Sequence, residues 1–209
     1  MATALKDEYK WALRSITGTN LVIFYAAVQT DSILQTDWLR LVTELGKSLP
    51  AGILLAAVSI LNAQLSWRAK ARLLFLRWHN PLPGRVAFTD LAHTDERIDL
   101  DQLEHAYGPL PTEHAAQNKL WYKLYQSVED TPSVRYVNRE WLFARDWACL
   151  AVLALIVLGP IGFFQIPSVE TAFFYVFLML NQIVFVGRAA RVNARRLVTT
   201  VLALKSTDK

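Results

Sequence analysis

The sequence predicts an all-α integral membrane protein: four transmembrane helices in a two-plus-two arrangement, with a small helical cytoplasmic insert between the pairs. Three observations support this fold class. Hydrophobic residues make up 53% of the 209-residue chain and charged residues 19%, against about 45–50% and about 25% in soluble domains. Charges are segregated, since residues 147–169 and 171–187 contain no Asp, Glu, Lys or Arg. Basic residues are also distributed unevenly among the segments that face water.

Four uncharged stretches give the predicted spans. About 20 helical residues cross a bilayer core of ~30 Å, and the two C-terminal stretches, assigned to spans 147–165 and 171–187, fit this length. The stretch "PAGILLAAVSILNAQLSW" gives a span at 50–66, and "SITGTNLVIFYAAVQT" begins a span at 15–33. A buried helix of a soluble protein is the alternative for this first span. It lacks an A-x-A-like cleavage site, so we expect it to stay in the mature protein.

These spans divide the chain into an N-terminal membrane hairpin (1–66), an insert (67–146) and a C-terminal hairpin with a basic tail (147–209). Gly159-Pro160 is expected to kink or end the third span.

The distribution of lysine and arginine predicts the orientation in the membrane. The segment before the first span, the insert and the tail together hold 20 of the 22 basic residues, and the segment 31–49 holds the other two. Because Lys and Arg are retained on the cytoplasmic side during insertion, we expect both termini and the insert to be cytoplasmic. Four tryptophans at predicted span edges fit the same boundaries, since indole rings favour the headgroup zone: Trp11, Trp38, Trp67 and Trp147.

The outer segment 36–49 has a helical apolar face, and we expect it to lie along the membrane interface or to cap the bundle. That face consists of Trp38, Leu41, Val42, Leu45 and Leu49.

The insert is predicted to consist of short helices that pack on the two long helices entering the membrane. Residues 67–79, "WRAKARLLFLRWH", have the spacing of a helix that continues the second span outward, and "NPLPG" stops it. Residues 99–108 start with Asp99 as a cap for Gln102 and end at Gly108. The only strand-like run, residues 84–91, is too short to build a sheet.

Two further helices follow in the insert. The helix at 112–128 is expected to begin at Thr112. Its predicted apolar face is Ala116, Leu120, Trp121, Leu124, Tyr125 and Val128, and its predicted polar face is Gln117, Asn118, Lys119, Lys123 and Gln126. Thr131 caps the next helix, with Pro132 in its first position, and no breaker separates this helix from the third span.

Motifs for catalysis and for cofactor binding are absent from the sequence. It contains no G-x-S-x-G, no phosphate-binding glycine loop and no H-E-x-x-H. The four histidines, all in the insert, lack the H-x-x-x-H spacing of a metal site, so a solvated acidic loop is the favoured interpretation. Cys149 is the only cysteine and lies inside a predicted span. We therefore expect no enzyme activity, no cofactor and no metal.

Polar side chains within the spans are the first candidate functional residues. Asparagine and glutamine in a membrane usually face another helix or a water-filled path, because lipid offers no hydrogen-bond partner. Two interpretations stay open: hydrogen bonds between helices, or the lining of a pore formed by several copies. The residues concerned are Asn62, Gln64, Asn181 and Gln182.

An arginine run follows the last span. Because the apolar stretch is complete before Arg188, a voltage sensor is disfavoured, and direct nucleic-acid binding is not expected so near the headgroups. The favoured interpretation is one helix that leaves the bilayer at Gly187, continues to about Leu204, and packs Leu197, Val198, Val201 and Leu202 on the insert. The residues expected to meet lipid headgroups are Arg68, Lys70, Arg72, Arg188, Arg191 and Arg195.

The layout of paired spans around a helical cytoplasmic insert resembles small four-span membrane effectors and sensors of bacterial anti-phage defence systems. The resemblance implies an oligomeric membrane effector or pore-forming component that is controlled through the insert. The alternative is a membrane-anchored sensor or scaffold that recruits a cytoplasmic partner protein. Its sequence feature is the set of aromatic residues on the helix at 112–128, with Trp121, Tyr122 and Tyr125 as the expected interface. Expected partners are therefore membrane lipids, further copies of the chain and a cytoplasmic protein.

Overall fold

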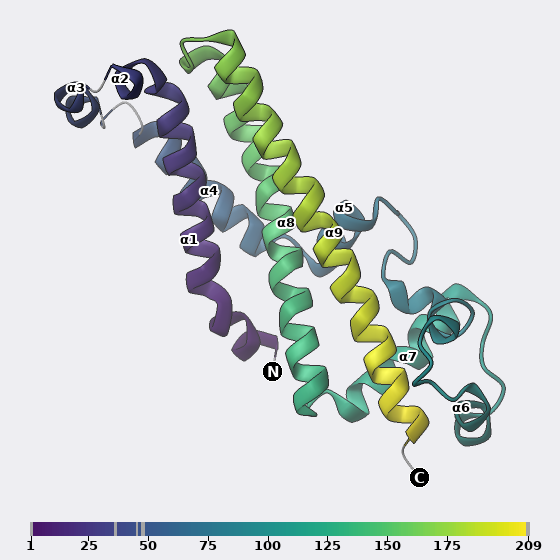
Figure 1. Ribbon diagram of the computed structural model, residues 1–209. Helices are drawn as coiled ribbons and strands as arrows, with labels where there is room; N and C mark the ends of the chain where they lie inside the picture. Colours follow the sequence, from purple (N-terminus) through teal and green to yellow (C-terminus); the bar gives the residue numbers. More distant parts are fainter. Residues whose placement is uncertain (1, 36, 45, 47–48, 208–209) are drawn as a thin grey trace. The chain divides into compact units, whose positions relative to one another are not determined.

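The computed structural model describes residues 2–35, 37–44, 46 and 49–207, and the regular structure in this part of the chain is helical (Figure 1). The helical prediction is thus confirmed for the described residues. In chain order the elements are α1 (Ala2–Val28), α2 (Thr30–Leu34), α3 (Trp38–Thr43), α4 (Leu49–Gln64), α5 (Trp67–Phe75), the 3₁₀ turns η2 (Pro83–Val86) and η3 (Leu91–Thr94), α6 (Leu100–Tyr107), α7 (His114–Val128), α8 (Pro132–Gln165) and α9 (Val169–Thr207).

The chain divides into two compact units. The first, called the apolar unit here, contains Met1–Ser66 and Asp146–Gly187. The second, called the insert unit, contains Trp67–Arg145 and Arg188–Lys209. The C-terminal tail is therefore part of the insert unit.

Helices α8 and α9 contribute to both units. α8 begins at Pro132, as predicted, and runs for 34 residues. Pro160 lies inside it without ending it, so the helix passes through Gly159-Pro160 and ends at Gln165. α9 runs for 39 residues and passes Gly187 without interruption. The prediction of one helix that continues from the last apolar stretch into the basic tail is confirmed.

Within the described residues, α8 and α9 are the two single helices that are long and apolar enough to cross a membrane. α4 has 16 residues, about 24 Å at 1.5 Å per residue, which is short of a ~30 Å core. It passes the same test only together with α5, as a pair bent by 104°. The structure thus supports two or three spans by length and composition. α1 has 27 residues, but polar residues interrupt its apolar part, including Thr17, Thr19 and Asn20.

Small residues let four helices share one core in the apolar unit. Leu55 of α4, Leu158 of α8 and Phe24 of α1 are at most 1% exposed. Tyr175 of α9 meets the Phe24 ring edge-on, with the ring centroids 5.8 Å apart. Alanines allow the helix backbones to approach closely. The alanines of this core are Ala51, Ala154 and Ala172.

The core of the insert unit is formed by α5, the 3₁₀ turns, α6, α7 and the polar halves of α8 and α9. Leu103 of α6 and Val134 of α8 are fully buried. The four tail residues predicted to be covered are at most 5% exposed, which confirms their burial: Leu197, Val198, Val201 and Leu202. Asp99 accepts a hydrogen bond from the Gln102 amide at 3.0 Å, and Gly108 has φ +80°, as the predicted ends of α6 require.

Two local predictions are wrong. The helix predicted over 67–79 does not continue the helix before it, because α4 ends at Gln64 and α5 begins at Trp67. α5 then ends at Phe75, and the next residue, Leu76, takes φ 52°. α7 begins at His114, two residues after the predicted Thr112, because the Glu113 carboxylate caps it by accepting from the Ala115 and Ala116 amides. In the segment 36–49, Trp38 and Val42 are exposed and Leu41 is partly buried. Leu45 lies outside the described residues, and the placement of this segment along the membrane interface or as a cap stays a prediction.

Candidate functional site

Asn62 joins two helices of the apolar unit. Its side chain is 5% exposed, and its Nδ2 donates a 3.0 Å hydrogen bond to the main-chain oxygen of Asp146 in α8. The Asp146 carboxylate accepts a 3.3 Å bond from the Tyr9 hydroxyl of α1. The Asn62 Oδ1 is buried without a partner among the described residues. Asn62 therefore makes a bond between helices, the first of the two interpretations given for the amides in the predicted spans.

The other three amides are not drawn into that contact. Gln64 is exposed on α4, and Gln182 is half-buried on α9. Asn181, also half-buried, donates a 2.8 Å bond to the Phe177 oxygen one turn earlier in its own helix. These three side chains are at least partly exposed, so they can contact lipid or another chain.

The basic residues predicted to meet lipid headgroups are exposed, with one exception. Arg68 and Arg72 lie over the indole rings of Trp67 and Trp78, at 5.2 and 5.6 Å from the ring centroids. Arginine beside exposed tryptophan is typical of a membrane interface. The exposed tail residues are Arg188, Arg191, Arg195 and Arg196.

The exception is Lys70, for which the headgroup prediction is wrong. Its residue is 2% exposed and lies on the covered face of α5 with Ala71 and Leu74. An ammonium at that position does not reach a lipid surface. The helical spacing places Lys70 between Arg68 and Arg72 in sequence but on the other side of the helix.

The aromatic helix α7 does not present the predicted partner interface. Trp121 is 7% exposed, because its ring packs under the backbone of η2: a Cβ added to Gly84 would lie 2.9 Å from the indole Cε3. The prediction for Trp121 is therefore wrong. Tyr125 is half-buried, and its hydroxyl accepts a 3.0 Å bond from Asn138 Nδ2. Burial raises the pKa of Tyr125 to about 12, so this hydroxyl stays protonated at neutral pH. Tyr122 is 51% exposed.

Gln117, placed on the polar face of α7 by the sequence analysis, is instead fully buried. Its Oε1 accepts hydrogen bonds from the amides of Phe88 and Thr89, at 3.0 and 3.3 Å. Its Nε2 donates a 2.8 Å bond to the main-chain oxygen of Thr112. Gln117 thus provides hydrogen-bond partners for backbone groups in two loops, which do not form the bonds of a regular helix.

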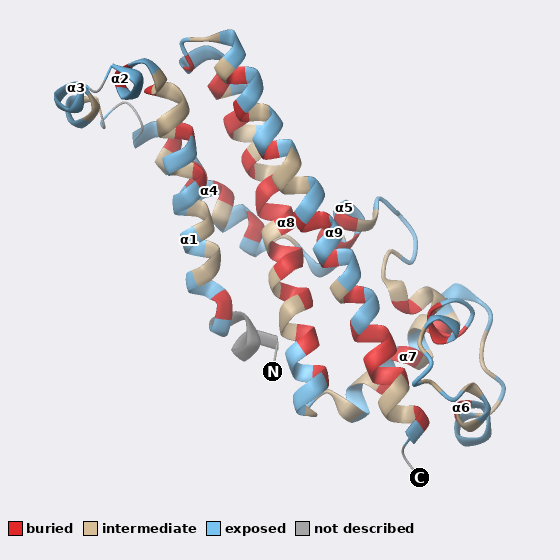
Figure 2. Ribbon diagram, viewed as in Figure 1, coloured by how far each residue is buried: buried red, intermediate tan, exposed pale blue. Residues whose placement is uncertain are grey.

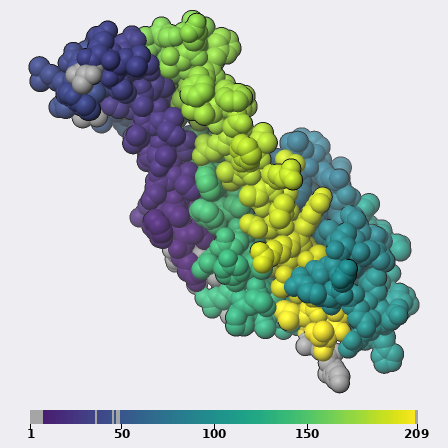
Figure 3. All heavy atoms as spheres, in the orientation of Figure 1, coloured from purple at the N-terminus to yellow at the C-terminus, as the bar shows by residue number. Residues whose placement is uncertain are grey.

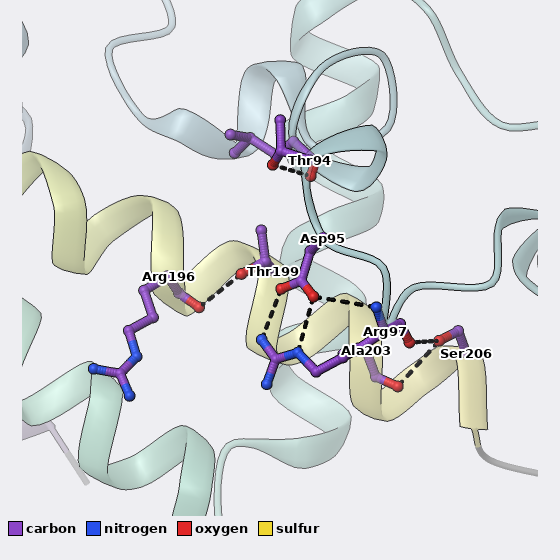
Figure 4. Close-up of polar contacts among 8 residues, drawn as sticks. Thr94, Asp95, Arg97, Arg196, Thr199, Ala203 and Ser206 are labelled. Carbon is purple, nitrogen blue, oxygen red and sulfur yellow. Dashed lines mark hydrogen bonds and ion pairs between the residues drawn. The ribbon is translucent and has the colours of Figure 1, made fainter.

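A polar cluster that the sequence analysis missed ties the end of α9 to the loop before α6 (Figure 4). Asp95 forms two ion-pair contacts with Arg97, at 2.8 Å to Nε and 2.7 Å to Nη2, and it accepts from the Arg97 amide at 3.2 Å. The main-chain oxygen of Arg97 accepts a 3.4 Å bond from Ser206, which is 1% exposed. The Thr199 hydroxyl of α9 lies close enough to contribute to the lowered pKa of Asp95. The D-x-R spacing of Asp95 and Arg97 was the available sequence signal.

Replacement of Asp95 by asparagine is expected to lower the free energy of unfolding of the insert unit by ~1 kcal/mol at pH 7. Hydrogen bonding from Arg97 lowers the pKa of Asp95 from 3.8 to about 2. A carboxyl with a lowered folded-state pKa stabilises the protein above its unfolded pKa, and this stabilisation is lost as the pH falls from about 4 to about 2. Urea unfolding at pH 7 and at pH 2.5 should therefore show a difference between wild type and Asp95→Asn that shrinks in acid. Asp90→Asn, at an exposed position nearby, is the control; an equal loss in both variants would contradict the prediction.

One face of α9 is left uncovered in the apolar unit (Figures 2 and 3). In the most apolar 18-residue window of α9, 22% of the residues are buried, against 44% in α8. Such a surface is covered by lipid or by another protein chain. The large exposed side chains of this face are Phe173, Phe174, Phe177, Leu178, Leu180, Val184 and Phe185.

The described residues hold no group of three or more His, Cys, Asp or Glu side chains arranged to bind a metal ion. What the structure presents is an apolar unit with an uncovered helix face, and an insert unit joined to it by two unbroken helices. Comparison with protein families, with curated proteins and with solved structures finds no match to this chain.

Proposed function

We propose that the chain is a multi-pass effector of the bacterial inner membrane, with both termini and the insert in the cytoplasm, controlled through its insert unit. The observation that supports this most is the continuity of α8 and α9, which belong to both units without a break. A partner or signal that repacks the insert unit acts directly on the residues of the same two helices that pass through the apolar unit. Four spans are the proposed topology, because α1 and α4 share the core of α8 and α9.

The uncovered face of α9 supports an oligomeric form of this effector, because only 22% of the residues in the most apolar stretch of α9 are buried within one copy. In a membrane, assembly through this face would bring Asn181 and Gln182 of several copies close to one another. Such an assembly is the proposed route to a leak through the bilayer, in the manner of anti-phage effectors of similar layout. Asn62 is excluded from the proposed lining, because it is buried within one copy.

The experiment is a leak assay with purified protein in liposomes, combined with cross-linking to count copies. Wild type is expected to release an encapsulated dye faster than protein-free liposomes and to cross-link as an oligomer. Ala189→Pro breaks α9 just beyond Gly187, because proline removes the amide that bonds one turn back, and we expect it to change the leak rate about tenfold, or ~1.4 kcal/mol of coupling. Ala189→Gln, at the same exposed position, preserves the helix and should behave as wild type.

Absence of both leak and oligomers in every variant would contradict the effector proposal and favour the second candidate, a membrane-anchored scaffold. The observation that favours that candidate is the set of exposed apolar side chains on the insert unit, including Leu76 at 81%, Trp78 at 76% and Tyr122 at 51%. A cytoplasmic partner that is retained by wild type and lost from Tyr122→Ser would then identify the scaffold.

A further inference from the structure

The apolar unit contains a groove between α1 and α9, and two of its lining residues, Phe174 and Leu178, also belong to the uncovered face of α9. Its volume is about 530 Å³. Ile23 and Ala26 of α1 and Thr30, the first residue of α2, form one wall. Glu170, Tyr175 and Leu178 of α9 form the other.

The groove is polar at one end and apolar along the rest of its length. Thr30 follows the C-terminal end of α1, and Glu170 is the second residue of α9, so the polar lining residues lie where one helix ends and the other begins (Figure 1). Ile23 lies seven residues before Thr30, and Leu178 lies eight residues after Glu170, which places the apolar end about 10–12 Å deeper at 1.5 Å per residue. This gradient matches an amphiphile with a polar head and a hydrocarbon tail.

A second observation points to a ligand. Tyr175 lines the groove and is 2% exposed, yet its hydroxyl has no hydrogen-bond partner among the described residues. A buried hydroxyl without a partner is unfavourable, and native proteins rarely leave one. Tyr175 lies five residues after Glu170, about 7.5 Å deeper along the helix, the depth at which a glycerolipid carries its ester carbonyls below the headgroup. The hydroxyl itself is covered, so a carbonyl at that depth would accept its proton once the ring turns toward the groove.

Charge selects the class of lipid. Glu170 is exposed, and it is the one ionisable carboxyl among the nine residues that line the groove. A carboxylate repels a headgroup whose charge is purely anionic and attracts a primary ammonium, which also donates charge-assisted hydrogen bonds.

We propose that this groove binds one molecule of an amine-bearing phospholipid of the phosphatidylethanolamine class. The acyl chain lies along Ile23, Ala26 and Leu178, an ester carbonyl accepts from Tyr175, and the ammonium pairs with Glu170. The site rests on the proposed membrane placement of the apolar unit, but it does not depend on leak or on oligomer formation.

The test is native mass spectrometry of the full chain in detergent, titrated separately with phosphatidylethanolamine, phosphatidylcholine and phosphatidylglycerol of identical acyl chains. We expect a one-to-one adduct with phosphatidylethanolamine that forms about tenfold more tightly than the other two, the size of one charge-assisted pair. Glu170→Gln should reduce this preference to within about twofold. Tyr175→Phe should weaken all three lipids about threefold and leave the preference unchanged.

Ala26→Phe, which fills the groove, should abolish the one-to-one adduct with each lipid. The melting temperature of each variant in detergent without lipid shows whether it is folded. Equal binding of the three lipids, or a preference that survives Glu170→Gln in folded protein, would overturn the proposal. A lipid-free dimer that Ala26→Phe disrupts would assign the groove to a second copy and would also overturn it. Because binding is measured in detergent, failure here is distinguishable from failure of the leak assay.

Discussion

Replacement of Gln117 by leucine is expected to lower the free energy of unfolding of the insert unit by ~4 kcal/mol, the largest effect of any single substitution considered for this chain. Leucine is similar in size to glutamine, so the change removes hydrogen bonds with little change in packing volume. The Phe88 and Thr89 amides lose their acceptor, and the Thr112 oxygen loses its donor. Since Gln117 is fully buried, water does not replace these bonds without opening the structure.

The expected loss of stability follows from the asymmetry of hydrogen-bond energetics. A made bond contributes only ~1 kcal/mol net, but a buried group left unsatisfied costs ~1–3 kcal/mol. Three orphaned backbone groups therefore account for ~4 kcal/mol even if one of them finds a new partner.

Urea unfolding of the purified chain in detergent, followed by tryptophan fluorescence, measures this loss. The control is Gln126→Leu, on the same helix but exposed, which should change stability by less than ~0.5 kcal/mol. If the two variants unfold at the same urea concentration, Gln117 is not the junction that its contacts indicate.

The helical spacing of α7 did indicate the burial of Gln117, but the prediction gave more weight to its polar side chain. Gln117 lies four residues before Trp121 and seven before Leu124, so it shares a stripe with both. Its polar character assigned it to the solvent face, although the spacing alone placed it among the covered residues. What the sequence did not contain was the partner: the backbone amides it satisfies are 28 and 29 residues away, in a loop whose path depends on the fold.

The long helices were predictable because local signals and composition agreed. Thr131-Pro132 marks the start of α8, and no glycine or proline interrupts α9 between the apolar stretch and the basic tail apart from Gly187, which a helix tolerates. The break at Ser66 also had a signal, since serine directly before Trp67 is a favoured residue at a helix start. The continuous apolar and aromatic pattern outweighed it.

The candidate site was less predictable because its residues change role with their surroundings. The sequence correctly grouped Trp121 with Leu124 on one face of α7, but an exposed partner interface and a covered core have the same pattern. The distinction depends on Gly84, which lies 37 positions earlier and brings backbone against the indole ring. Lys70 is a similar case: its charge predicts exposure, while its position beside Ala71 and Leu74 on α5 places it in the core.

Gly84→Ala is expected to destabilise the insert unit by ~2–3 kcal/mol, the cost of overpacking a filled core. The new Cβ would lie 2.6 Å from the Asn118 Oδ1 and 2.9 Å from the Trp121 Cε3. The amide of Asn118 can rotate away, because its Oδ1 makes no hydrogen bond within the described structure. The indole cannot, because it is 7% exposed and stacks on Tyr125 with the ring centroids 5.7 Å apart. Either η2 or the ring must therefore shift.

Thermal unfolding and the near-ultraviolet circular dichroism of the tryptophans would report this shift. Gly18→Ala is the matched control: its Cβ would meet no atom within 4 Å, and alanine in a helix interior stabilises by ~0.5–1 kcal/mol relative to glycine. The same chemical change should thus have opposite signs at the two positions. A double variant, Gly84→Ala with Trp121→Phe, should lose less than the sum of its single changes, because the smaller ring makes room for the methyl group. Strict additivity would mean that η2 does not rest on Trp121, and the burial that excludes this residue from a partner interface would then need another cause.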